Sequence, residues 1–199
     1  MNVFVGCSSR APKTELYCHC CRIAESIADW IVDNGDNYVF GAGKTGLMGV
    51  IYNRIIERRK QQNQPEQNEA QNTTKVFGLT LERWANDLSQ MECDLGIPLA
   101  TLSDRKQMLF QMADVMVFLP GGLGTIDEIF SAIETKRSGE HNKDIIICNV
   151  DGYFDALLCM INSSARESFT QYFGEALYYV VSDGRELCLL YTSDAADEA

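Results

Sequence analysis

Basic residues are scarce in this sequence of 199 residues. Lys and Arg number 17 against 28 Asp and Glu, so the formal net charge is -11. Because nonspecific affinity for nucleic acids comes largely from basic side chains on phosphates, this balance argues against a nucleic-acid partner. A small phosphorylated ligand needs only a local group of donors. Lys44, Arg105, Lys106 and Lys136 all lie near glycine-rich segments or helix starts.

Long apolar runs are also missing. No run approaches the roughly 20 residues that a membrane-spanning helix needs. The first residues, Met-Asn-Val-Phe-Val-Gly, lack the basic segment and the apolar run of a signal peptide, and they predict a strand instead. We therefore expect no membrane partner and a cytoplasmic location.

Spaced cysteine pairs are absent, although the sequence has eight cysteines. The cysteines are too scattered for a disulfide framework, and several lie in apolar stretches, so we predict reduced thiols. The cluster Cys18-His19-Cys20-Cys21 invites a zinc interpretation. It lies inside a predicted helix and lacks a spaced second ligand pair, so we predict no metal site.

Strands and helices alternate along the chain, which predicts an α/β fold with a doubly wound parallel sheet. The length fits a single domain, expected over 1–190, with 191–199 as a disordered or non-native tail. The polar stretch 61–74 is predicted to be a solvated helix end or a flexible loop, and Ser103 to be the N-cap of the following helix. Strands are expected at 2–7, 38–40, 75–81, 115–119, 144–150 and 178–181, and helices at 14–33, 47–59, 104–113, after 125, at 153–162 and at 185–190.

The segment Pro120-Gly-Gly-Leu-Gly-Thr125 joins a predicted strand to a predicted helix. Ligands of parallel α/β sheets bind at such places, where helix N-termini present unpaired N–H groups. Gly121, Gly122 and Gly124 would let the backbone approach an anion, and Thr125 could add a hydroxyl and cap the helix. A tight turn alone needs about one glycine, so three favour an anion site.

The segment Gly41-Ala-Gly-Lys-Thr-Gly46 satisfies the G-x-G-x-x-G pattern. A phosphate-binding P-loop is rejected because the segment lacks the first glycine of that motif and its four-residue spacer. A dinucleotide site is disfavoured because the pattern follows the second strand, not the first, and no acidic residue closes the next strand.

Two charged residues lie near these segments. Glu128 follows Thr125 by three residues, so its carboxylate could face the sugar of a nucleotide and stabilise charge at the anomeric carbon. It could equally be an ordinary acid favoured by the helix dipole. Arg105 has the same ambiguity, because a planar guanidinium suits phosphate or carboxylate but exposed helix arginines are common.

Three segments together resemble the LONELY GUY family, often labelled "possible lysine decarboxylase". They are Gly41-Ala-Gly-Lys-Thr-Gly-Leu-Met-Gly49, Arg105-Lys106 and Pro120-Gly-Gly-Leu-Gly-Thr-Ile-Asp-Glu128. The similarity runs from Val5-Gly-Cys-Ser-Ser9 to about Leu190. It implies a Rossmann-like fold, a homodimer, no cofactor, and hydrolysis of the N-glycosidic bond of cytokinin riboside 5'-monophosphates to free base and ribose 5-phosphate.

The resemblance also implies residue roles. The catalytic pair would be Arg105 and Glu128. The phosphate and nucleotide site would comprise Ser9, Gly43, Gly46, Lys106, Gly121, Gly122, Gly124 and Thr125.

The sequence departs from the family pattern in three places: Gly41-Ala-Gly43 replaces three glycines, Ser103-Asp104 replace the common His-Glu, and the stretch 61–74 is unusual. Such segments border the base pocket, so AMP and N6-substituted AMP both stay open as substrates. The alternative is a non-catalytic carrier or sensor of a nucleotide or nucleotide cofactor. Amino-acid decarboxylation would need a lysine Schiff base with pyridoxal phosphate, for which no lysine is suitably placed.

Overall fold

The computed structural model describes residues 1–62, 74–170, 177–184 and 186–187. The predicted tail 191–199, most of the polar stretch 61–74 and most of the helix expected at 185–190 lie outside the described residues. In chain order the elements are β1 (Asn2–Gly6), α1 (Glu15–Asp33), β2 (Asn37–Phe40), α2 (Gly46–Gln62), β3 (Val76–Leu81), η1 (Glu82–Trp84), α3 (Ala85–Leu88), β4 (Leu95–Leu99), α4 (Leu102–Met112), β5 (Val115–Phe118), α5 (Leu123–Arg137), β6 (Asp144–Cys148), η2 (Val150–Gly152), α6 (Asp155–Arg166) and β7 (Tyr179–Val181).

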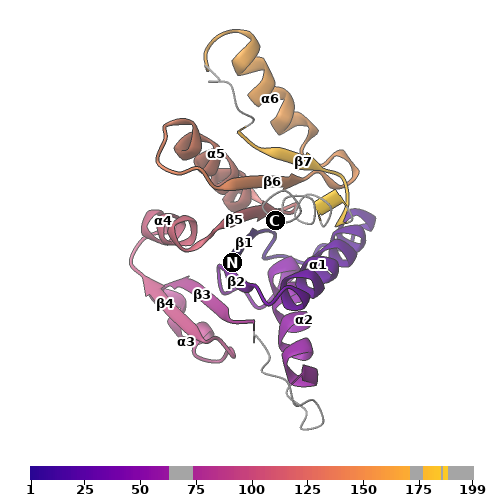
Figure 1. Ribbon diagram of the computed structural model, residues 1–199, viewed down its shortest axis with the longest axis vertical. Helices are drawn as coiled ribbons and strands as arrows, with labels where there is room; N and C mark the ends of the chain where they lie inside the picture. The colour runs from indigo at the N-terminus through magenta and orange to yellow at the C-terminus, as the bar shows by residue number, and fades with distance from the viewer. Residues whose placement is uncertain (63–73, 171–176, 185, 188–199) are drawn as a thin grey trace, which may run out of the picture.

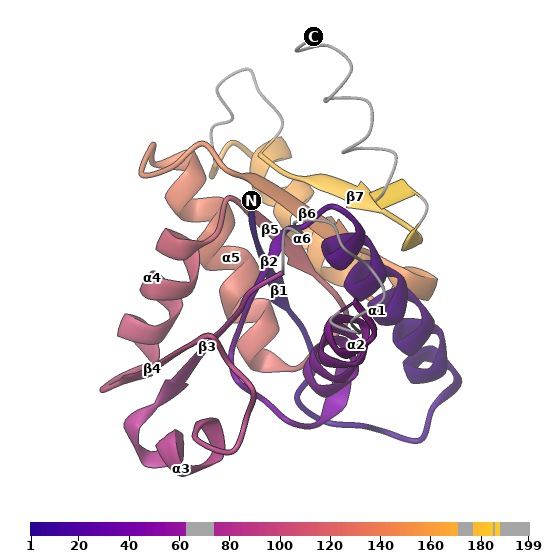
Figure 2. The same ribbon diagram turned by 60° about the horizontal axis from the view of Figure 1, so that its bottom comes forward.

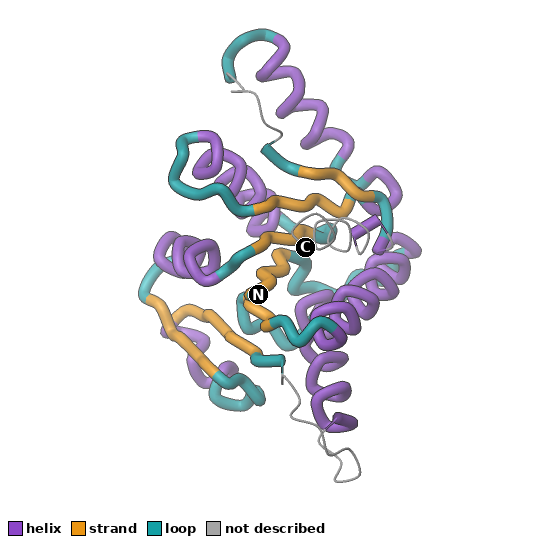
Figure 3. Tube along the Cα trace, in the orientation of Figure 1, coloured by secondary structure: helices purple, strands orange, loops and turns teal. Residues whose placement is uncertain are grey.

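The strands form one parallel seven-stranded sheet in the order β4-β3-β2-β1-β5-β6-β7. The order reverses at β1, which pairs with β2 on one side and β5 on the other. Strands alternate with helices along the chain (Figure 3). This confirms the predicted α/β class and the doubly wound sheet.

The sheet is covered on both faces because its strands are apolar on both faces. Val3 and Val5 of β1 pack in the cluster that contains α1 and α2, whereas Phe4 between them packs in the cluster that contains α4 and α5. Figure 1 shows these two pairs of helices on opposite sides of the sheet. Near-continuous apolar strands of this kind are typical of buried parallel sheets.

Three local expectations were wrong. The segment 95–99, expected to be irregular, is the edge strand β4. Its sequence does not predict a strand because Gly96 and Pro98 interrupt the pattern, but an edge strand tolerates proline. Thr101, not Ser103, caps α4, since its hydroxyl accepts from the Asp104 N–H. Helix α5 begins at Leu123 with Gly122 as N-cap, so Thr125 is buried inside the first turn and is not the cap.

No helix among the described residues is long and apolar enough to cross a membrane. The cysteines of the described part of the chain are all free, and Cys7, Cys20 and Cys148 are buried. Over the same residues, His, Cys, Asp and Glu form no group of three that could hold a metal ion.

Candidate active site

A cavity of about 790 Å³ lies at the carboxyl edge of the sheet, and we call it the main cavity. Its walls are formed by the segments that follow β1, β2, β3 and β5 and by the start of α4. The strands and α4 are labelled in Figure 2. Its volume is in the range of small-molecule sites. Its lining is Phe4–Arg10, Gly41–Thr45, Met48, Thr80, Trp84, Asp87, Leu102, Arg105, Gly122–Thr125 and Glu128.

The first turn of α5 leaves space beside its backbone. A Cβ added at Gly122 or Gly124 would meet no atom within 4 Å. Gly121 differs, because a Cβ there would lie 2.2 Å from the Thr125 hydroxyl oxygen. The Thr125 side chain therefore packs against the backbone of Gly121. The first N–H groups of a helix have no partner within it, and Gly122 and Gly124 leave room for an anion beside this backbone.

Glu128 lies one turn further along α5, and its side chain passes over the end of β1. A Cβ added at Gly6 would lie 3.0 Å from Glu128 Oε2. Burial raises the pKa of Glu128 from 4.5 to about 7, with Asp127 adding to the rise and Arg105 and Lys106 opposing it. A carboxyl group of that pKa is available in both protonation states near neutral pH.

Arg105 reaches the same cavity from α4. Its Nε donates to Leu79 O of β3 at 2.9 Å and its Nη2 to Gly41 O, just after β2, at 3.0 Å, so two backbone carbonyls hold the guanidinium. A Cβ added at Gly41 would lie 1.7 Å from Nη2, so the side chain occupies the position of that Cβ. Burial lowers the pKa of Arg105, and Glu128 opposes this shift.

Arg105 and Glu128 influence each other across the cavity without a direct ion pair in the described structure. The Arg105 side chain passes over Gly41, just after β2, and the Glu128 side chain passes over Gly6, at the end of β1. A cation held by backbone carbonyls and an unpaired carboxylate of raised pKa, both facing one cavity, form an arrangement more typical of active sites than of structural ion pairs.

The structure brings most, but not all, of the predicted site residues together. Seven of the ten line the main cavity: Ser9, Gly43, Arg105, Gly122, Gly124, Thr125 and Glu128. Gly121 lines a neighbouring cavity instead, and Gly46 lines neither. Lys106 lies outside both linings, and its Nζ donates to Asp127 Oδ2 at 2.7 Å.

Some residues of the cavity were not anticipated from the sequence. Gly6, Arg10, Trp84 and Asp87 line it as well. Gly6 ends the first strand and Arg10 lies in the loop after it, so both could have been found from their positions. Trp84 lies in η1 and Asp87 in α3, two short helices whose sequence carries no motif, so only the folded chain reveals them.

The family model described as "Possible lysine decarboxylase" matches residues 38–189 of the chain. Cytokinin riboside 5'-monophosphate phosphoribohydrolase LOG2 of Arabidopsis thaliana is 29% identical over 168 residues, 84% of this chain and 70% of that protein. The Oryza sativa subsp. japonica protein named "Probable cytokinin riboside 5'-monophosphate phosphoribohydrolase LOG4" is 33% identical, over 83% of this chain and 66% of its own length.

Solved structures with a similar fold include two proteins connected with the molybdenum cofactor. The Moco carrier protein from Chlamydomonas reinhardtii superposes with a TM-score of 0.66 at 14% identity, covering 98% of both chains. The molybdenum cofactor binding protein from Rippkaea orientalis gives 0.60 at 13% identity, over 98% of this chain and 96% of that one. At such identities the likeness shows the fold alone.

Proposed function

Because the chain belongs to the LONELY GUY family, whose model covers residues 38–189, we propose that it hydrolyses the N-glycosidic bond of nucleoside 5'-monophosphates. The products are the free base and ribose 5-phosphate. The names of the plant relatives support this reaction. The observation that supports this reaction most directly is that Glu128 and Arg105 line the same cavity, beside the open N-terminus of α5.

The 5'-phosphate binds at the first turn of α5. Gly122 and Gly124 leave room for it, and the unpaired N–H groups of the helix end supply donors. Glu128 lies over Gly6 at the end of β1, the strand that pairs with β5. Neighbouring strands are ~4.8 Å apart, so a ribose attached to that phosphate comes to the carboxylate of Glu128.

In its ionised form Glu128 stabilises the positive charge that develops on the ribose as the glycosidic bond breaks, and it positions the attacking water. The half-buried setting that raises its pKa strengthens this electrostatic effect, because less water screens it. Arg105 orients the substrate and balances the negative charge, since its guanidinium is already fixed by two carbonyls.

The base points toward the segment that follows β3. Three inter-strand spacings separate β5 from β3, or ~14 Å, which leaves space beyond the ribose for a base. Trp84 and Leu102 line this region and are 46% and 59% exposed, so they present apolar surface to the ligand. That surface favours N6-substituted AMP, the cytokinin form, over AMP itself.

We further propose a cytoplasmic homodimer. The free, partly buried cysteines support a reducing compartment, and the family resemblance supports the dimer. Light scattering of the purified protein measures the second point directly: a mass near 45 kDa is expected from two chains of 22.3 kDa.

The decisive experiment compares Glu128→Gln with Glu134→Gln. Both remove one carboxylate from α5, but Glu134 is exposed and pairs with Arg137. AMP and isopentenyladenosine monophosphate are incubated with each protein, and free base is quantified by chromatography. We expect Glu128→Gln to lower kcat/KM on the order of 1000-fold with nucleotide binding retained, and Glu134→Gln to match the wild type. Normal turnover by Glu128→Gln would overturn the assignment.

A second candidate is a non-catalytic carrier of a nucleotide or nucleotide cofactor, because the open N-terminus of α5 can hold a phosphate whether or not a bond is then broken. The same experiment separates the two candidates. Tight nucleotide binding by the wild type with no release of base from either substrate would support the carrier.

A further inference from the structure

A second cavity of about 620 Å³ adjoins the main one, and we call it the side cavity. The two share five lining residues: Ser8, Ser9, Arg10, Thr45 and Gly122. The rest of its wall consists of Ala11, Pro12, Thr14, Leu16, Tyr17, Cys20, Leu47, Pro120, Gly121 and Tyr153. The side cavity is therefore a neighbouring compartment with its own walls, large enough for a chemical group of substantial size.

Gly122 lines both cavities, so the main cavity and the side cavity meet at the position proposed for the phosphate. It is the N-cap of α5, and a Cβ there would meet nothing within 4 Å. If a phosphate at this helix end has its ribose on the main-cavity side, a group bonded to another oxygen of the same phosphate would enter the side cavity.

Charge distinguishes the side cavity from the rest of this acidic protein. None of the described residues that line it is Asp or Glu, whereas Asp87 and Glu128 line the main cavity. Arg10 lines both cavities, is exposed, and has no carboxylate within ion-pair distance in the described part of the chain. Lys44, in contrast, already donates to Gln90.

The backbone at Arg10 is held by hydrogen bonds, so its Cα has a defined position in the wall that the two cavities share. Ser8 Oγ donates to Arg10 O at 2.8 Å and accepts from Arg10 N at 3.0 Å. Ser8 N in turn donates to Pro120 O at 3.2 Å, which ties this loop to the segment before α5. An arginine with no carboxylate partner among the described residues therefore lies in the shared wall, within reach of a further anionic group in the side cavity.

We propose that the side cavity binds the second phosphate group of a nucleoside 5'-diphosphate, or of an ester of one, with Arg10 as its counter-charge. This rests on the proposed function, because it takes the first phosphate to lie at α5. The ligand class of the protein then extends beyond monophosphates. The apolar wall formed by Leu16, Tyr17 and Tyr153 accepts a group esterified to the second phosphate.

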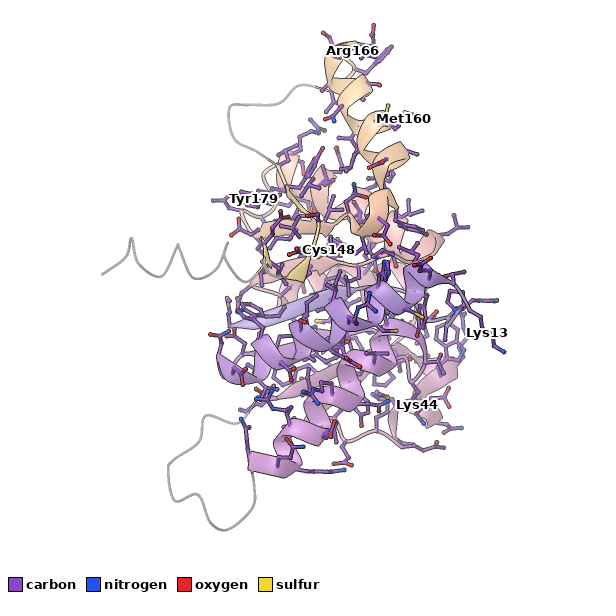
Figure 4. The ribbon with its side chains drawn as sticks, turned by 90° about the vertical axis from the view of Figure 1, so that its right-hand side faces the viewer. Lys13, Lys44, Cys148, Met160, Arg166 and Tyr179 are labelled. Atoms are coloured by element: carbon purple, nitrogen blue, oxygen red, sulfur yellow. The ribbon has the colours of Figure 1, made fainter. Side chains whose placement is uncertain are left out.

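Isothermal titration calorimetry with AMP and ADP tests the proposal on three proteins. We expect the wild type to bind ADP about tenfold more tightly than AMP, the scale of one charge-assisted pair. Arg10→Gln should weaken ADP binding about tenfold and AMP binding no more than about threefold. Lys13→Gln is the matched control, because Lys13 is exposed on the same loop, lines neither cavity and points away from the body of the protein (Figure 4).

A second variant tests the cavity instead of the charge. Ala11 is exposed and lines only the side cavity, so Ala11→Trp should fill that space and weaken ADP-ribose binding more than AMP binding. Equal affinity of the wild type for AMP and ADP would overturn the proposal, as would equal effects of Arg10→Gln and Lys13→Gln. If AMP itself fails to bind, the phosphate position and the proposed function fail as well, so the two failures are distinguishable.

Discussion

The two glycine-rich segments of this protein look alike in sequence and serve different purposes in the structure. In the segment before and within α5, Gly122 and Gly124 face open space. In the segment between β2 and α2, Gly41, Gly43 and Gly46 face atoms of the protein itself, namely Arg105, Met48 and the backbone of Ser8–Arg10. A glycine can make room for a ligand or for a neighbouring chain segment, and only the structure distinguishes the two uses.

The strongest test of this comparison is Gly46→Ala. Gly46 has φ +66°, and a Cβ there would lie 2.4 Å from Ser8 O, with backbone that cannot move aside cheaply. We expect a loss of about 2–4 kcal/mol in the free energy of unfolding. Urea denaturation measures it. The folded fraction should keep its kcat/KM within a few-fold, and a specific loss of activity without a loss of stability would place Gly46 among ligand-facing glycines.

Gly41→Ala should lower activity more than stability, the reverse of what we expect for Gly46→Ala. Its Cβ would displace the end of the Arg105 side chain and not backbone, so the loss in the free energy of unfolding should be smaller than for Gly46→Ala, about 1–2 kcal/mol for the hydrogen bonds to Leu79 O and Gly41 O. Activity should fall on the order of 100-fold, because the guanidinium loses its position over the cavity.

A mutant cycle checks that Gly41 acts through Arg105. If it does, adding Gly41→Ala to Arg105→Ala costs no further activity. Additive losses would show that Gly41 matters for another reason.

Gly124→Ala probes the segment whose glycines face open space and should give a smaller effect. The added Cβ has space and lies in the first turn of a helix, so the free energy of unfolding should rise by up to about 1 kcal/mol. Nucleotide affinity should fall about tenfold, since the methyl group occupies volume assigned to the phosphate. Calorimetry with AMP gives the affinity. Unchanged affinity would mean that the phosphate lies elsewhere.

The sequence predicts most of this fold because the fold depends on local patterns. The apolar strand before Gly6, the stripe of α1 and the strand before Pro120 all have clear periodicity and clear ends. Strand β4 escapes prediction because an exposed edge strand needs no continuous apolar face, and Gly96 and Pro98 are tolerated there.

The site is less predictable than the fold, because its geometry comes from elements far apart in the chain. Arg105 and Glu128 stand out from their motifs, but no pattern shows that they pass over Gly41 and Gly6. Lys106 adjoins Arg105 in sequence, yet the helix directs it to Asp127 outside the cavity. The roles of all these residues stay predictions until the variants are measured.

The smallest expected effect is on the free energy of unfolding, and it comes from holding the Glu128 carboxylate in its buried position. The pKa of Glu128 is about 7 in the folded protein against an ordinary 4.5, so the folded state favours the protonated form. Protonated Glu128 contributes to the stability of the folded state, and this contribution is fully present below pH ~4.5 and is lost as the pH rises through about 7. Glu128→Gln, which stays neutral, should therefore be more stable than the wild type at pH 8.

The gain at pH 8 should be about 1 kcal/mol, less than the pKa shift alone implies, because the variant leaves Arg105 without its counter-charge. At pH 4 both proteins are neutral at this position and should melt together. Glu134→Gln, on the same helix, removes an ion pair that lowers the pKa of Glu134, so it should bring no gain at pH 8. A Glu128→Gln protein less stable than the wild type at pH 8 would show that the carboxylate is there for structure, and the active-site interpretation of Glu128 would lose its main physical support.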